Sequence, residues 1–311
     1  MTNATQPNST LRSNENLGLL LGLIGVLIFS GSLPATRIAV ADIHPVWVAL
    51  ARVELAAVLS LIAIVVLKVP APPKHLWKAL ALTSFGVTVG FPIFSSVALY
   101  YTDASHGAII NGLLPLATAI VAVHMAREKP SFAFWASAIA GSLVVIAYAA
   151  MQSNGTLQIG DVYMFIAVIG GAIGYANGGK VSQVIGGWQT ICWALVVAAP
   201  VLLAPTLWMI LNGSYALKPV VSPQAWLGLA YVTVMSQWIG FFFWYGGMAV
   251  GGVSRVSQVQ LLQLFFTLLL AALINNESIQ LMTWLVAVVV VGIIVLNKKA
   301  AVQRSSSHKD F

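Results

Sequence analysis

The chain has 311 residues, of which 59% are apolar and only 7% are charged, and its formal net charge is +7. An average soluble domain carries about 25% charged residues, and no water-soluble fold could bury this much apolar surface. The composition therefore excludes a soluble protein and predicts an all-α integral membrane protein. The basic residues lie in short loops and near the chain end, a pattern typical of membrane orientation rather than of nucleic-acid binding.

The polar segment 1–16 lacks the basic start and the small-residue cleavage site of a secretory signal, so we expect it to remain as a cytoplasmic tail. After it come apolar runs of about the 20 residues that a helix needs to cross a membrane. Ten such runs are separated by polar residues, Gly or Pro: 17–40, 46–67, 77–101, 104–126, 132–151, 161–182, 187–210, 225–248, 254–274 and 281–297.

The Lys and Arg residues predict the orientation. If the N-terminus is inside, twelve of the fifteen fall in loops or tails on the inner side, and only Lys218 falls in an outer loop. Arg37 and Arg52 lie within helices. A missed helix would invert every later loop, so this asymmetry also favours the helix count. We expect a multi-pass protein of the cell inner (plasma) membrane with both termini cytoplasmic.

The chain shows a weak internal duplication. A shift of 149 residues places 98–131 over 247–280, and it superposes Ser105 on Ser254 and Glu128 on Glu277. Each half, 17–151 and 160–299, then holds five helices, with 300–311 as a C-terminal tail. Because five is odd, the halves would insert with opposite topology. Inverted repeats are a recurrent transporter architecture with a substrate cavity near the membrane midplane.

Three stretches carry a resemblance to a known family: PATRIAVADIHPVWVALARVELAA, ALYYTDASHGAIINGLLPLATAI and GDVYMFIAVIGGAIGYANGGKVSQ. The chain resembles the drug/metabolite transporter superfamily, specifically its ten-helix EamA branch, and within that branch a YddG-like aromatic amino-acid exporter. The resemblance spans about 17–299 and implies export of a small molecule. The second half departs from the family pattern, with Leu262-Gln263-Leu264 where a Glu-Pro pair is common.

Polar residues inside helices are costly unless they face protein or water. In the fourth helix Asn111, Pro115 and Thr118 share a face, and in its repeat partner, the ninth, four polar residues do the same: Ser257, Gln260, Gln263 and Thr267. We expect these faces to oppose each other across a central cavity. The alternative is that the amides only join helices by hydrogen bonds.

Three prolines interrupt apolar helices, and each leaves the carbonyl four residues earlier without its helical donor. They are Pro34, Pro92 and Pro115, and two of the residues with freed carbonyls, Ser30 and Asn111, also have polar side chains that could serve a ligand. Packing kinks or gating are the alternative. In the sixth helix the many glycines indicate close helix packing, while Tyr175 and Asn177 become cavity candidates because they superpose on Ser32 and Pro34.

Eight of the ten tryptophans lie near predicted helix ends, as in an interfacial belt; only Trp193 and Trp238 lie deeper. A cavity for planar amphipathic solutes needs a few aromatic rings. From the aromatic residues of the membrane interior we select Phe94, Trp193 and Trp238 as cavity candidates.

Glu54 is the only carboxylate deep in a predicted span. Proton coupling needs a titrating group in the membrane, and the predicted spans contain almost none. We therefore expect facilitated diffusion, with antiport through Glu54 as the alternative. Arg52, two residues away, need not pair with Glu54. Catalytic signatures are missing from the sequence, as are phosphate loops, metal-ligand clusters and a soluble ATPase domain, so we expect no enzyme, cofactor, metal or ATPase subunit. A channel or an intramembrane enzyme is a weaker alternative.

Neutral polar groups with aromatic rings fit amino acids, aromatic and other neutral amphipathic ones. Phosphorylated substrates would need a deep cluster of Lys and Arg, which the sequence lacks. Cationic drugs would need an intramembrane acid, and Glu54 is the only candidate. The sequence thus predicts a transporter that exports amino acids by alternating access, with lipid and a small-molecule substrate as its partners. The alternative is a proton-coupled drug/metabolite efflux transporter.

Overall fold

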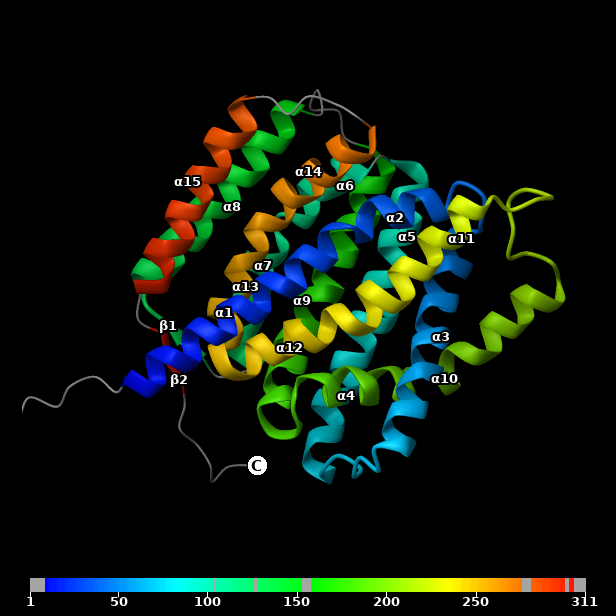
Figure 1. Ribbon diagram of the computed structural model, residues 1–311, viewed down its shortest axis with the longest axis horizontal. Helices are drawn as coiled ribbons and strands as arrows, with labels where there is room; N and C mark the ends of the chain where they lie inside the picture. Colours follow the sequence, from blue (N-terminus) through cyan, green and yellow to red (C-terminus); the bar gives the residue numbers. More distant parts are fainter. Residues whose placement is uncertain are drawn as a thin grey trace, which may run out of the picture.

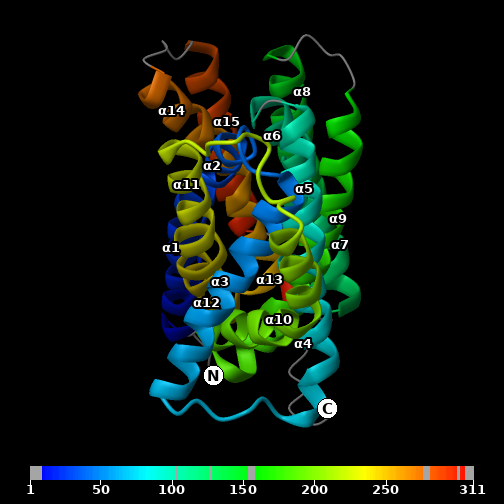
Figure 2. The same ribbon diagram turned by 90° about the vertical axis from the view of Figure 1, so that its right-hand side faces the viewer.

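A computed structural model describes residues 9–102, 104–125, 128–152, 158–275, 281–299 and 302–304. Residues 1–8 and 305–311 of the two predicted tails, and Glu277 of the repeat comparison, lie outside the described residues. The described part is a bundle of helices that run roughly along one direction, as Figure 2 shows. The first helix begins at Ser9, so half of the predicted N-terminal tail continues the first helix.

The first half of the chain forms five spans, which we number 1 to 5. Two are unbroken, and three consist of shorter segments in series. They are α1 (Ser9–Ser30) with α2 (Ser32–Ala39); α3 (Pro45–Val66); the short 3-10 helix η1 (Lys74–Leu76) with α4 (Trp77–Ser84), the π-helical η2 (Phe85–Gly90) and α5 (Phe91–Tyr101); α6 (Ala104–Asn111) with α7 (Leu114–Met125); and α8 (Phe132–Gln152).

The second half forms spans 6 to 10. They are α9 (Ile159–Ile185); α10 (Gly187–Leu211); α11 (Pro223–Ala230) with the π-helical η3 (Tyr231–Ile239) and α12 (Gly240–Gly251); α13 (Val253–Ser257) with the 3-10 helix η4 (Gln258–Leu262) and α14 (Gln263–Asn275); and α15 (Leu281–Lys299). By length and composition, six helices of the described residues can cross a membrane, and α7 and α8 hold shorter apolar stretches. The ten predicted apolar runs coincide with the ten spans, which confirms the all-α membrane fold.

The packing of the spans follows the inverted repeat. Span 1 packs along span 8, and its counterpart span 6 packs along span 3. Spans 2 and 7 pair directly, as do spans 5 and 10; Figure 1 shows α8 beside α15 and α1 running alongside α12. Exchanging the two halves therefore maps these span contacts onto one another or onto themselves.

Glycines let the paired spans approach closely. A Cβ added at Gly86 would lie 2.5 Å from the carbonyl oxygen of Gly170 and from the nitrogen of Gly174, so spans 3 and 6 touch through backbone. Spans 1 and 8 touch in the same way, through Gly18 and Gly251. The predicted role of the span 6 glycines in close packing agrees with these contacts.

The two ends of the bundle differ in what they hold. The start of α1 and the α3–α4 connection lie at one end, which we call the terminal end, while the α10–α11 connection lies at the far end (Figure 2). A short antiparallel pair of strands, β1 (Glu128–Pro130) with β2 (Val302–Arg304), ties the segment after α15 to the α7–α8 connection. These strands were not predicted from the sequence.

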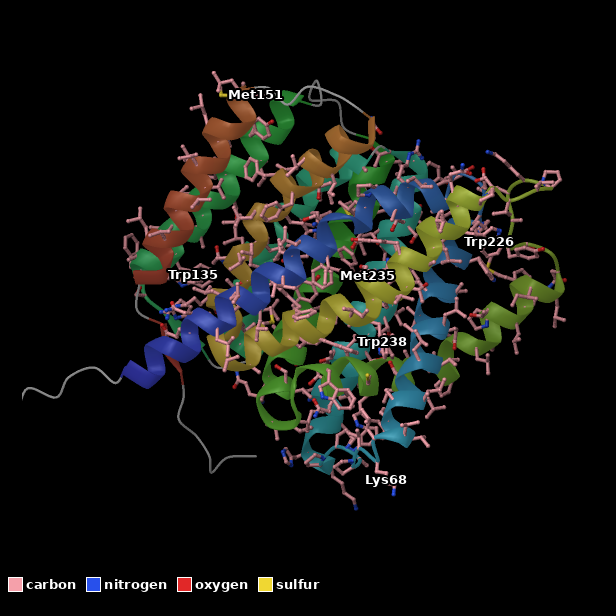
Figure 3. All side chains as sticks on the ribbon, in the orientation of Figure 1. Lys68, Trp135, Met151, Trp226, Met235 and Trp238 are labelled. Atoms are coloured by element: carbon pink, nitrogen blue, oxygen red, sulfur yellow. The ribbon has the colours of Figure 1, made fainter. Side chains whose placement is uncertain are left out.

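The tryptophans only partly follow the predicted belt. Figure 3 places Trp226 and Trp135 toward opposite ends of the bundle, as expected of interfacial residues. Trp244 is different: it was predicted to be interfacial, but it is fully buried in the core. The prediction for Trp244 was wrong because an inner-end position along the helix does not reveal which face of the helix the ring occupies.

Candidate functional site

Besides span 1, which is interrupted at Gly31, two pairs of repeat partners lose regular α-helical geometry at corresponding positions. The π-helical segments η2 and η3 begin at Phe85 and Tyr231, a separation close to the 149-residue repeat shift. Spans 4 and 9, which are also repeat partners, are interrupted after Asn111 and across Gln258–Leu262. Single π-helical turns and 3-10 segments inside helices are frequent at functional sites and hinges. The matched positions therefore mark the centre of the bundle as the place to look for a site.

A side chain connects the two π-helical segments. Gln237 of η3 donates from Nε2 to the carbonyl oxygen of Val87 in η2, at 2.9 Å, and both residues are buried. A π-helical turn disturbs the regular pairing of backbone carbonyls, which must find other donors in a dry interior. The Gln237 amide provides such a donor and joins the two repeats at their centre.

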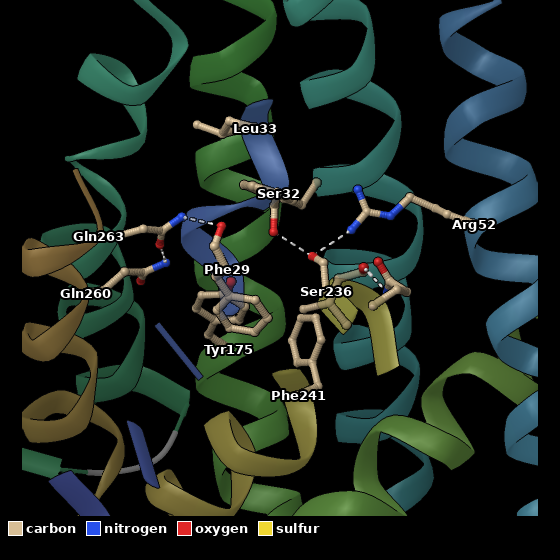
Figure 4. Close-up of a pocket in the computed structure, with 12 residues that line it drawn as sticks. Phe29, Ser32, Leu33, Arg52, Tyr175, Ser236, Phe241, Gln260 and Gln263 are labelled. Carbon is tan, nitrogen blue, oxygen red and sulfur yellow. Dashed lines mark hydrogen bonds between the residues drawn. The ribbon is translucent and has the colours of Figure 1, made fainter. Parts of the chain in front are cut away.

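A cavity lies between these segments, with residues of both repeats in its wall (Figure 4). Span 1 contributes Phe29, Ser32 and Leu33, and span 2 contributes Arg52. The remaining lining residues come from spans 3, 6, 8 and 9: Val87, Phe91, Tyr175, Ser236, Gln237, Phe241, Gln260 and Gln263.

Polar groups occupy two sides of the cavity. On one side Ser236 accepts hydrogen bonds from the Ser32 hydroxyl, at 2.7 Å, and from Nη2 of Arg52, at 3.2 Å. On the other side Gln260 donates to Oε1 of Gln263 at 3.0 Å, and Gln263 donates to the carbonyl of Phe29 at 3.3 Å. Figure 4 shows the two groups facing each other across the pocket.

Aromatic rings form the wall between these two polar groups. Phe29 stacks on Tyr175 with ring centroids 6.5 Å apart and meets Phe241 edge-on at 5.1 Å. Trp244 packs behind them, 5.3 Å from Tyr175. A planar apolar group bound here would find ring faces and edges at the distances typical of aromatic packing.

The cavity is closed in this conformation. Its volume is about 20 Å³, and a second cavity of about 10 Å³ lies beside it, with Gln260 and Gln263 in the walls of both. Sites that hold a small-molecule ligand usually measure about 300–1,000 Å³, whereas one water needs about 10–15 Å³. The surrounding spans must separate before an organic solute can enter.

The structure brings five of the predicted cavity residues together. Four of them line the central cavity: Ser32, Tyr175, Gln260 and Gln263. Asn111 lines the second cavity with Gln260 and Gln263, so this residue of span 4 lies beside the polar residues of span 9.

The other five predicted residues lie away from the cavity walls. Ser30 joins spans 1 and 9: its carbonyl accepts from Thr267 at 3.0 Å. The remaining four have their own neighbours. Phe94 stacks on Tyr163, Asn177 donates to the Ile173 carbonyl of its own helix, Trp193 packs on Trp77, and Trp238 packs on Phe242.

The three prolines share one structural position. Pro34, Pro92 and Pro115 each lie in the first turn of a helical segment that follows an interruption, in α2, α5 and α7. Proline is tolerated there because the first-turn nitrogen has no helical acceptor. Pro34 lines an apolar groove on the bundle surface rather than the central cavity.

Several cavity residues were missed by the sequence analysis. Arg52 was not assigned to a site, and Phe29, Ser236 and Gln237 were not singled out. Gln237 carried a usable signal, since it is an amide in the middle of an apolar helix. Arg52 also carried a signal, since it is a charged residue inside a predicted span. The sequence does not show, however, whether Arg52 or Glu54 faces the interior of the bundle.

Glu54, the predicted coupling residue, is not among the residues that line the cavity. Its side chain is partly exposed, and its Oε1 atom is buried without a hydrogen-bond partner. Arg52, two positions earlier on α3, is buried and reaches the cavity. Residues two apart on a helix point in different directions, so the two charged side chains lie in different surroundings.

Polar contacts tie the repeats together at both ends. At the far end Asp42 forms an ion pair with Lys218 and accepts hydrogen bonds from the Ser222 hydroxyl and backbone; we call these three residues the far-end clasp. The hydrogen bond from Lys218, helped by Ser222, lowers the pKa of Asp42 to about 2. Near the start of α1, Glu15 pairs with Nη1 of Arg255 at 2.6 Å.

The sequence of this chain matches a family model and two curated proteins. The model of the EamA-like transporter family matches residues 16–149 and again residues 158–298. Among curated proteins, "Uncharacterized transporter YdeK" of Bacillus subtilis (strain 168) is 42% identical over 287 residues, which cover 92% of this chain and 97% of that protein. "Uncharacterized transporter YyaM" of the same organism is 26% identical over 82% of this chain and 83% of its own length.

A solved structure supports the same fold. A protein described only as "Crystal structure of protein" superposes with a TM-score of 0.69 at 17% identity, over 91% of this chain and 98% of that chain. Among the described residues, no group of three or more His, Cys, Asp or Glu side chains could hold a metal ion. The two family matches coincide with the two sets of five spans, and the chain belongs to the EamA-like transporter family.

Proposed function

We propose that this transporter exports amino acids, aromatic and other neutral amphipathic ones, by alternating access. The observation that carries the proposal is the closed central cavity, in which hydroxyl and amide groups face each other across an aromatic wall. Such a lining binds a solute that has polar and apolar parts. The narrower likeness to YddG-like exporters supports the same substrate class, and the direction of transport rests on that likeness.

Alternating access is supported by the symmetry of the interruptions. Discontinuous helices at the centre of inverted repeats provide the points about which the halves of a transporter rock. The contacts that tie the repeats at both ends, together with a cavity of about 20 Å³, fit a closed intermediate between two open states. A channel would instead keep a continuous polar pore.

Facilitated diffusion is the energetic mode that we propose. The one deep carboxylate, Glu54, lies outside the cavity wall, so its protonation does not act directly on a bound solute. The alternative is proton-coupled efflux through Glu54.

The test is transport by purified protein in liposomes, with a panel of labelled amino acids and with cationic drugs as comparison. We expect amino acids to equilibrate without accumulating, and an imposed pH gradient to leave the final level unchanged. If the pH gradient drives accumulation and Glu54→Gln abolishes it, the protein is an antiporter. If no amino acid moves while a cationic drug does, the proposed substrate class is wrong.

We also propose an orientation, with the terminal end in the cytoplasm and the 212–222 connection outside. The excess of Lys and Arg in the loops of the terminal end supports it. Reporter fusions after residues 70, 215 and 311 should give cytoplasmic, external and cytoplasmic signals. An external signal at residue 311 would overturn the orientation.

A further inference from the structure

We infer that Arg52 is the receptor for a carboxylate of the substrate, and that the amide oxygens of Gln260 and Asn111 accept hydrogen bonds from its ammonium group. The inference rests on the proposed function and sharpens it: the substrate must carry a carboxylate, and α-amino acids fit both ends of the site.

The first observation is an uncompensated charge. Arg52 is 2% exposed, lies within α3 more than a turn from either end, and lines the central cavity. Nη2 donates to Ser236, but Nε has no hydrogen-bond partner. No ion pair joins Arg52 to a carboxylate of the described residues. A buried arginine in a membrane is costly unless it is paired.

The chemistry of the guanidinium group selects the ligand. Arginine keeps its charge under physiological conditions, and its planar fork matches a carboxylate with two parallel hydrogen bonds. One donor is held by Ser236, which fixes the plane of the group and leaves the others available. In Figure 4 the guanidinium of Arg52 points from α3 toward Ser236 and the pocket.

The second observation is a pair of acceptors on the opposite side. Gln260 donates to Gln263, and this bond leaves Oε1 of Gln260 buried without a donor. Oδ1 of Asn111, in the wall of the adjoining cavity, is also buried without a donor. An ammonium group is a donor only, so it satisfies both oxygens. The site thus has a cationic end and an acceptor end.

The competing explanation is that Arg52 only holds span 2 against span 8 through Ser236. In that role Arg52 would contact only protein, and the rate of transport would not depend on whether the solute carries a carboxylate. A receptor role, by contrast, makes transport depend on the carboxylate, and substitution of Arg52 should erase that dependence. The two explanations can therefore be separated by varying the solute as well as the residue.

The experiment compares four probes that share one aromatic ring: phenylalanine, phenylalaninamide, phenethylamine and 3-phenylpropionate. Uptake into liposomes and thermal stabilisation of the detergent-purified protein are measured for each. For the natural protein we expect phenylalanine to give the largest effects, and the two probes without a carboxylate to bind and move at least tenfold more weakly. The acid without an ammonium group should be intermediate.

Three variants complete the design. Arg52→Gln should reduce phenylalanine uptake at least tenfold and leave the amide probe unchanged, while Arg52→Lys should retain part of the preference because it keeps the charge. Arg37→Gln is the matched control: Arg37 bonds the carbonyls of Leu99 and Tyr100 outside the cavity, so its loss should not alter the preference. The melting temperature without probe shows whether each variant is folded.

The outcomes separate the inference from the proposed function. Equal uptake of phenylalanine and its amide by the natural protein overturns the carboxylate receptor and leaves amino-acid transport standing. Stabilisation by carboxylates without transport supports the receptor and overturns the proposed function. If folded Arg52→Gln keeps the full preference for carboxylates, Arg52 is only a structural residue.

Discussion

Two pairs of repeat partners, spans 3 and 8 and spans 4 and 9, share their helix interruptions but carry different side chains at them. In the first repeat, η2 offers the carbonyl of Val87 and runs into Pro92, whereas in the second repeat, η3 carries Ser236 and Gln237 to the cavity. Span 2 brings Arg52, while its partner α10 carries no charged residue. Asn111 and Gln260 are the closest to a symmetric pair, since both are amides that line the same cavity.

The shared backbone pattern and the unequal side chains have two different roles. A backbone pattern shared by both halves allows either half to rearrange in the same way, which is what alternating access requires. Unequal side chains give the site a direction, with a cation on one side and amides on the other. Substitutions in the shared frame should therefore abolish activity, and those at the unequal side chains should change its degree or selectivity.

The largest effect is expected from Gly174→Leu. A Cβ at Gly174 would lie 2.8 Å from the backbone nitrogen of Val87, so span 6 must move away from span 3. Overpacking typically costs about 1–3 kcal/mol, and here it also displaces η2. We expect transport to be lost and the melting temperature to fall, with the same result for Gly18→Leu in the other repeat.

Gly292→Leu is the control for those variants. Gly292 lies on an exposed face of α15, and an added Cβ there would meet nothing within 4 Å. It should transport and melt as the natural protein does. A stable, active Gly174→Leu would show that close contact of spans 3 and 6 is dispensable.

Gln237→Leu should have the next largest effect, because it removes the bond that joins the two π-helical segments. A buried carbonyl left without a donor costs about 1–3 kcal/mol. We expect slower transport and a lower midpoint of thermal unfolding. Gln224→Leu, the same change at an exposed position of α11, should do neither. Equal behaviour of the two variants would mean that this bond does not couple the repeats.

Asn111→Leu and Gln260→Leu test the nearly symmetric pair. Loss of one hydrogen bond to a ligand costs about 1 kcal/mol, which corresponds to roughly a fivefold weaker apparent affinity. Both proteins should remain inserted and folded, and their concentration dependence of uptake should shift by about that factor. Natural affinity in both variants would assign the amides to packing alone.

The smallest effect concerns the far-end clasp. The folded pKa of Asp42 is about 2, below its ordinary value of 3.8, so the clasp stabilises the protein above that ordinary value and loses this contribution as the pH falls toward 2. The melting temperatures of the natural protein and Asp42→Asn should differ at pH 6, and the difference should shrink as the pH falls below 3.8 and be lost near pH 2. A constant difference would exclude Asp42 as the titrating group.

The spans could be predicted because hydrophobic length and the loop charges leave few choices. The interruptions in spans 4 and 9 were also within reach, since Pro115 and the polar row around Gln260 mark them. The π-helical segments were only partly within reach, since Pro92 marks a disturbance just after η2 but no proline follows η3 in span 8.

The cavity was only partly predictable for a related reason. Asn111, Gln260 and Gln263 stand out as polar residues on a shared helix face. Phe29 and Phe94 look alike in the sequence, and only the rotation of each helix decides that Phe29 lines the cavity while Phe94 packs on Tyr163. In a chain where apolar residues face both lipid and protein, hydrophobicity does not report that rotation.

The single cysteine has a practical consequence. Cys192 is fully buried within α10, among packed side chains. Water-soluble maleimides therefore have little access to it, and the natural chain already serves as an unreactive background for site-directed labelling. Pairs of new cysteines at the two ends, one pair at a time, could carry spectroscopic probes without prior removal of a native thiol. Distances between such probes would report directly on which end of the bundle opens when a solute is added.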